Sequence, residues 1–148
     1  MASTTFSGPV TSTNGFIGAL TGNIAGTGRI THTPTAINAT ATATAAQVAT
    51  GYITSTSVGT VSITLPTGTL LGAALGATQG TVFDLYIDNT AGASVVTIVV
   101  AVNGILSTAA ADTPGSFGDL TVASGATGLA RFTLMFSSAT AYAFSRTA

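Results

Sequence analysis

The sequence contains no cysteine, tryptophan, lysine or glutamate, and only one histidine, His32. Without cysteine, neither a disulfide framework nor a thiolate metal site can form. A single histidine leaves one possible base for a Ser-His-Asp triad, and no nucleophile-elbow motif accompanies it. The sequence therefore predicts no catalytic residues, no enzyme activity and no cofactor.

Charge is almost as scarce. Three arginines and four aspartates give 148 residues a net charge of -1; they are Arg29, Arg131 and Arg146, and Asp84, Asp88, Asp112 and Asp119. An ordinary chain has about 25% charged residues, against 5% here. Because binding to a phosphate backbone needs a basic patch, we do not expect a nucleic-acid partner. Weak mutual repulsion between copies instead favours a subunit of an assembly.

Long apolar runs are also missing. The longest, residues 95–102, is interrupted by Thr97 and is far shorter than the roughly 18 residues that suggest a membrane span. The opening residues, "MASTTFSGPV", have neither the basic nor the apolar segment of a signal peptide. We therefore expect no membrane partner and no standard export signal.

One acidic cluster is worth weighing as a metal site. Asp84 and Asp88 are four apart on an expected strand, so both point to one face, and Asn89 follows. Calcium takes six to eight oxygen ligands, and the spacing is not that of an EF-hand loop. A solvated strand face ending in an Asp-Asn turn explains the residues better, so we predict no metal site.

The amino-acid composition divides the chain into two parts. Residues 1–46 are rich in glycine, threonine and alanine and end in the alternating "ATATATAA". From residue 47 onward, short apolar runs alternate with turn signals, the pattern of an all-β module. We therefore predict an extended arm over 1–46 and, over 47–148, a single compact β-sandwich or barrel-like module.

About seven strands and one short helix are expected in the module. The strands are predicted over 51–55, 58–65, 81–88, 94–102, 118–123, 128–137 and 141–146. Residues of opposite polarity alternate in several of them, which places one face of each strand in a core. The helix is predicted within "GTLLGAALGA", residues 68–77. The turns at 88–94 and 123–128 are predicted to close two β-hairpins.

The stretch "GFIGALTGNIAGTG", residues 15–28, is the most unusual part of the arm. As a helix it would hold several interior glycines, at roughly 1 kcal/mol each. As an extended chain it alternates large residues (Phe16, Leu20, Ile24) with glycines. Such a row indicates a segment that packs on a partner, while a flexible linker is the alternative. The residues predicted to contact that partner, another protein or another copy of the chain, are Phe6, Phe16, Ile17, Leu20, Ile24 and Arg29.

A second feature of the arm is the regular spacing of Thr40, Thr42 and Thr44. In an extended segment, three threonines at every second position place three hydroxyls on one face. A flat threonine array is also the surface that an ice-binding protein presents. Ice binding therefore remains a remote alternative function.

Residues 51–100 resemble a widespread type of small tailed-bacteriophage virion protein. The shared phrases are a "GYITST" opening strand, a strand ending in "LPT", a short Leu/Ala-rich helix and an "F-x-x-x-I-D-N-T-A-G-A" hairpin. The resemblance continues less specifically through "VASGATGLARFTLMFSSATAYAFSR". The order of the phrases is more specific than any one of them.

The resemblance implies a capsid decoration (cement) or head-fibre protein that is a homotrimer. Such a protein is made in the host cytoplasm and binds the major capsid protein on the outer surface of the virion, which it stabilises. A head or tail fibre that binds a host receptor or glycan is the alternative, although the absence of tryptophan argues against a sugar platform.

Overall fold

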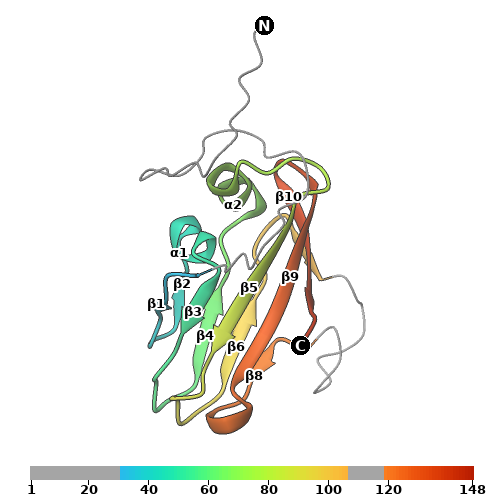
Figure 1. Cartoon of the computed structure of the whole chain (residues 1–148). Helices are drawn as coiled ribbons and strands as arrows, with labels where there is room; N and C mark the ends of the chain where they lie inside the picture. The colour runs from blue at the N-terminus through green and yellow to red at the C-terminus, as the bar shows by residue number, and fades with distance from the viewer. Residues whose placement is uncertain (1–30, 107–118) are drawn as a thin grey trace, which may run out of the picture. The chain divides into compact units, whose positions relative to one another are not determined.

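The computed structural model describes residues 31–106 and 119–148 (Figure 1). Thr31–Ala148 forms one compact unit of the chain and is described here by itself. The predicted arm-contact residues, Phe6 to Arg29, lie outside the described residues. No helix in the described part of the chain is long and apolar enough to cross a membrane.

Strands dominate this unit and form two mixed sheets, which confirms the mainly-β prediction at that level. The six-stranded sheet has the order β1 (Thr35–Ala36), β3 (Tyr52–Thr54), β5 (Val82–Asp88), β9 (Leu129–Ser138), β10 (Ala141–Arg146), β7 (Gly104–Leu106). The four-stranded sheet has the order β2 (Ala41–Thr42), β4 (Val61–Thr64), β6 (Val96–Val99), β8 (Thr121–Val122).

Consecutive strands from β1 to β6 alternate between the two sheets. Strand β1 is parallel to β3, and β3 is parallel to β5; β2, β4 and β6 are likewise parallel. Each pair of successive strands therefore makes one coil of the chain, and three coils stack in register. The alternation between sheets continues as far as β9, but the direction of pairing changes: β9 is antiparallel to β5, and β10 is antiparallel to β9.

This alternation contradicts the two predicted hairpins. The turn at 88–94 leads from β5 to β6, and the turn at 123–128 leads from β8 to β9, so each turn connects different sheets. The turn residues were identified from glycine and Asp-Asn signals, which specify a reversal but not the sheet of the next strand. Among the described residues, the consecutive strands that pair as a hairpin are β9 and β10.

Two helices lie together at one end of the unit, with the turns after β3, β5 and β8 at the other (Figure 1). Helix α2 (Gly68–Leu75) was predicted, whereas α1 (Ala45–Ala49) was not. The Thr-Ala alternation reads as extended chain, but Thr44 and Gln47 form a capping box that begins a helix. A 3₁₀ turn, η1 (Gly125–Thr127), follows β8.

Each end of helix α2 has its own capping residue. The Thr67 hydroxyl accepts a hydrogen bond from the N–H of Leu70 at the start, and Gly76, with φ of 59°, ends the helix in the left-handed conformation. Gly68 and Gly72, one turn apart, face the β9–β10 turn. A Cβ at either position would overlap with backbone oxygens of Thr140 or Ala139, so only glycine permits this close approach.

Both sheets contribute to one hydrophobic core. The predicted alternation is confirmed on β4, where Val61 and Ile63 are buried, and on β9, where Phe132, Leu134 and Phe136 are buried. Met135, between two of these, is 54% exposed. The Phe132 and Phe144 rings stack with their centroids 4.9 Å apart, which joins β9 to β10.

The compact unit begins earlier than the composition boundary at residue 46. Strands β1 and β2 pair with β3 and β4, and Ile37 and Ala43 are buried in the core. The buried side chains of this segment are one isoleucine and one alanine. The segment therefore lacks the apolar run by which a strand is recognised from sequence. Residues 31–46 therefore form the first coil of the module.

Candidate functional site

The polar and aromatic side chains of the six-stranded sheet gather on its outward face. Strand β5 turns Leu85 and Ile87 into the core, so the alternate residues face outward. The same parity holds on β3 and β9. The outward residues that we call the tyrosine face are Tyr52, Asp84, Tyr86, Asp88 and Arg131. All are partly buried.

Three of these residues form a row across three strands. Tyr52 is in register with Tyr86, and Tyr86 is in register with Arg131. The ring of His32 adds a further aromatic group, with its centroid 5.7 Å from that of Tyr86. Beside the row, Tyr86, Leu129, Arg131 and Ala148 line a shallow hollow of about 240 Å³.

Hydrogen bonds fix one end of this face. The Tyr52 hydroxyl donates to Asp88 Oδ2 at 2.5 Å, and the hydroxyl and N–H of Thr90 both donate to Asp88 Oδ1. The Thr90 hydroxyl, followed by that of Tyr52, holds the pKa of Asp88 below its ordinary value. The hydrogen bond to the carboxylate in turn raises the pKa of Tyr52. Asp88 is therefore an anion that locks the Tyr52 ring in place.

The second aspartate has a different partner. Asp84 Oδ1 accepts a hydrogen bond of 2.7 Å from the Thr133 hydroxyl on β9. Because a strand rises about 3.3 Å per residue, Asp84 and Asp88 are roughly 13 Å apart along β5, too far to share one ion. Within residues 31–106 and 119–148, no group of three or more metal-ligating side chains is present.

His32 contacts the backbone that leads into β3. Its Nδ1 lies 3.0 Å from the carbonyl oxygen of Thr50, and its ring packs against the backbone of Gly51. Gly51 has φ of 76°, and a Cβ there would overlap with the imidazole. In the described part of the chain, the His32 hydrogen bond thus goes to a backbone carbonyl and not to a carboxylate or a serine.

The threonine array does not present three free hydroxyls. The Thr40 hydroxyl accepts a hydrogen bond from the N–H of Ser62, and the Thr44 hydroxyl accepts one from the N–H of Gln47. Only Thr42 lies in a strand. Two of the three side chains therefore stabilise the first coil and the start of α1.

An apolar groove lies at the helical end of the four-stranded sheet. Its volume is about 460 Å³, and its lining comes from residues 42–45 and 64–67, together with Leu70 and Ala101. Leu70 is 59% exposed at its edge. The caps of both helices, Thr44 and Thr67, are part of this lining.

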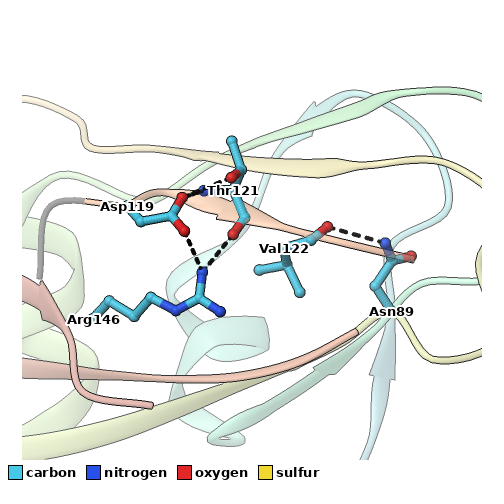
Figure 2. Close-up of polar contacts among 5 residues, drawn as sticks. All are labelled: Asn89, Asp119, Thr121, Val122 and Arg146. Atoms are coloured by element: carbon cyan, nitrogen blue, oxygen red, sulfur yellow. Dashed lines mark hydrogen bonds and ion pairs between the residues drawn. The ribbon is translucent and has the colours of Figure 1, made fainter. Parts of the chain in front are cut away.

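A polar cluster joins the two sheets at the end of β10 (Figure 2). Arg146 Nη1 donates to Asp119 Oδ2 at 2.9 Å and to the carbonyl oxygen of Thr121 at 2.6 Å. The side chains of Arg146 and Asp119 are only 18% and 5% exposed. The guanidinium also lies 6.0 Å from the centroid of the Phe132 ring. Arg146, the last residue of β10, is thereby bound to β8.

Asn89 makes a second cross-link, also drawn in Figure 2. Its Nδ2 donates to the carbonyl oxygens of Ser94, Val122 and Ala123 at 2.8, 3.2 and 2.9 Å. Asn89 is fully buried, and its Oδ1 has no hydrogen-bond partner among the described residues. The side chain holds together the two turns that had been predicted as hairpins.

The sequence singles out Asp84, Asp88 and His32 as candidate site residues but not Tyr52 or Tyr86. The usable signal was the alternation in "VFDLYID", which places Tyr86 on the same face as the two aspartates. The position of Tyr52 beside Tyr86 follows only from the parallel register of β3 and β5. Comparison with protein-family models, curated proteins and solved structures finds no match for this chain.

Proposed function

We propose that this chain is a structural virion protein, a capsid decoration (cement) protein that binds the outer surface of an assembled phage head and stabilises it. The observation that carries the proposal is the order of elements in the segment with the phage resemblance. Residues 51–100 form β3, then β4 followed by Leu65-Pro66-Thr67, then α2 and β5, and then the turn that begins at Asn89. The two strands, the helix and the third strand follow the order expected from the resemblance, but the turn at Asn89 leads to β6 of the other sheet and does not close the expected hairpin.

We propose further that the two sheets pack as a sandwich and that three copies associate. The shared core supports the sandwich, since buried residues of both sheets belong to one cluster. The low charge supports association, because copies with a net charge near -1 repel each other weakly. A trimer on a threefold lattice point would present each copy to an equivalent capsid site.

The mechanism is adhesive. A protein that binds the assembled shell but not its dissociated subunits stabilises the shell by mass action. Three binding sites on one trimer add their contributions, so each contact can be weak. We propose that Phe6, Phe16, Ile17, Leu20, Ile24 and Arg29 supply the contacts to the capsid or to a neighbouring subunit.

The first experiment mixes the purified full chain with empty capsids that lack decoration. Cosedimentation at a fixed ratio to the major capsid protein, together with a higher dissociation temperature of the shell, is the expected result. Sedimentation velocity of the free protein tests the trimer separately. A chain that binds neither empty nor filled capsids would reject the proposal.

A second experiment deletes residues 1–30, which precede the compact unit Thr31–Ala148. Circular dichroism and a thermal melt first establish that the shortened chain folds. Loss of capsid binding is then expected, and binding at full affinity would exclude the arm as the anchor. Adsorption to host cells without capsid binding would favour the fibre alternative, and thermal hysteresis of the free protein would favour ice binding.

A further inference from the structure

The chain has no tryptophan, and its outward aromatic surface is supplied by the tyrosine face instead. The described residues include three tyrosines, of which Tyr142 is buried in the core and the other two occupy neighbouring outward positions on β3 and β5. Adjacent strands are about 4.8 Å apart, so rings at paired positions form one continuous aromatic surface. The ring of His32 adds a further aromatic group beside Tyr86.

Charges of both signs border the rings. Asp84 and Asp88 flank Tyr86 on β5, and Arg131 is in register with Tyr86 on β9. The Arg131 Nε–H donates to the Thr147 hydroxyl, and no carboxylate of the described residues forms an ion pair with this guanidinium. The surface therefore offers hydrogen-bond donors and acceptors side by side, without a large field of one sign.

The face also has a recess of limited size. The hollow of about 240 Å³ beside Tyr86 and Arg131 is smaller than the roughly 300–1,000 Å³ of pockets for drug-sized ligands. An aromatic ring and a guanidinium both line it. Such a recess suits one small ring of a longer ligand that lies along the sheet.

From these observations we infer that the tyrosine face binds a neutral carbohydrate. The apolar face of a sugar ring stacks on the tyrosine rings, and a hydroxyl of that ring accepts from Arg131; hydroxyls of neighbouring sugar units donate to Asp84 and Asp88, which are too far apart to bind one ring. Interleaved charges complement a neutral ligand that has donors and acceptors of its own. This site does not rest on the proposed capsid-binding role and would remain if that role were rejected.

Other ligand classes fit the same face less well. An anion would be attracted by Arg131 but repelled by the two aspartates in the same row of strands. A cation would be repelled by Arg131, and the aspartates are too far apart to chelate one ion. An apolar segment would leave the charged groups desolvated without partners.

The closing experiment probes the full chain with an array of neutral and acidic oligosaccharides, the neutral ones including glucans, galactans and N-acetylglucosamine oligomers. A neutral sugar that is retained is then titrated into ¹⁵N-labelled protein. We expect saturable shifts of the amide signals of Tyr52, Tyr86 and Arg131. Retention of acidic sugars alone, of no sugar at all, or shifts confined to another surface would each overturn the inference.

Three variants distinguish the loss of ring stacking from a general loss of stability. Tyr86→Ala removes a ring and is expected to weaken binding by about tenfold or more, as loss of a stacked aromatic contact does. Tyr86→Phe keeps the ring and retains most of the affinity. Met135→Ala changes an exposed residue of the same sheet, on β9 away from the tyrosines, and is the matched control. Equal loss in Tyr86→Ala and Met135→Ala, with unchanged melting temperatures, would contradict the site.

Discussion

The α-carbon of Gly72 packs against the carbonyl oxygen of Ala139, so helix α2 meets the β9–β10 turn with no side chain between them. Gly68 makes the same kind of contact with Thr140 one helical turn earlier. The α2–hairpin contact is thus set by two glycines at positions i and i+4, a spacing that puts both on one helix face.

Gly72→Ala is expected to destabilise the protein by roughly 2 kcal/mol or more, because its Cβ would overlap with a backbone oxygen that cannot move aside cheaply. Intrinsic propensity predicts the opposite sign, since alanine stabilises an exposed helix interior by about 1 kcal/mol relative to glycine. Urea denaturation measures the difference. Gly59→Ala is the control, since nothing lies within 4 Å of a Cβ at that position; a Gly72→Ala protein as stable as this control would disprove the close contact.

Breaking the Arg146–Asp119 pair is expected to loosen the junction between the sheets. Arg146→Met keeps the length of the side chain but removes the ion pair with Asp119, whose side chain is only 5% exposed. We expect a loss of roughly 2–3 kcal/mol in the free energy of unfolding, at or below the range for a fully buried pair. Arg131→Met, which removes a cation from the outward face, should change the free energy by about 0.5 kcal/mol or less.

Asn89→Ala tests the other cross-link in Figure 2. The substitution leaves the carbonyl oxygens of Ser94, Val122 and Ala123 without this donor. The expected cost is about 2–4 kcal/mol, measured by thermal and chemical unfolding. Asn38→Ala, which removes an exposed side chain bonded to the N–H of Thr56, supplies the matched comparison. Similar stabilities of the two variants would show that the buried amide does not hold the turns together.

The free energy of unfolding is expected to fall at high pH because the buried Tyr142 ionises less readily in the folded protein. Burial raises the pKa of Tyr142 to about 12, whereas a tyrosine in an unfolded chain titrates near 10. Its contribution is therefore fully present below about pH 10 and is lost as the pH rises towards 12, by roughly 2–3 kcal/mol in total. Unfolding free energies measured across this range should show a smaller decline in Tyr142→Phe. The outward Tyr86→Phe should keep the loss that Tyr142 causes, and an identical decline in both variants would count against the assignment.

Much of the fold was predictable because its elements carry local signals. The period of two on β4 and β9 identified which residues are buried, and the Leu/Ala-rich run "GTLLGAALGA" marked α2. Each of these signals depends on residues close together in the sequence. The strands they identify are correspondingly those with several large apolar side chains.

What could not be predicted depends on pairing between distant segments. Whether the turn at Asn89 closes a hairpin or crosses to the other sheet is decided by the partners of β5, which are β3 and β9. Strands β1 and β2 have two residues each, too few for a periodic signal. The candidate site depends on the same distant pairing, since Tyr52 and Tyr86 become neighbours only through the parallel register of β3 and β5.

The alternation of successive strands between two sheets also bears on how fast this chain folds. Parallel partners such as β3 and β5 are joined by a complete coil, so the chain must close a long loop before their hydrogen bonds form. The hairpin of β9 and β10 is the exception, with its strands joined by a two-residue turn. Folding slower than for a helical protein of the same length is therefore expected, with this hairpin as the local structure that forms first.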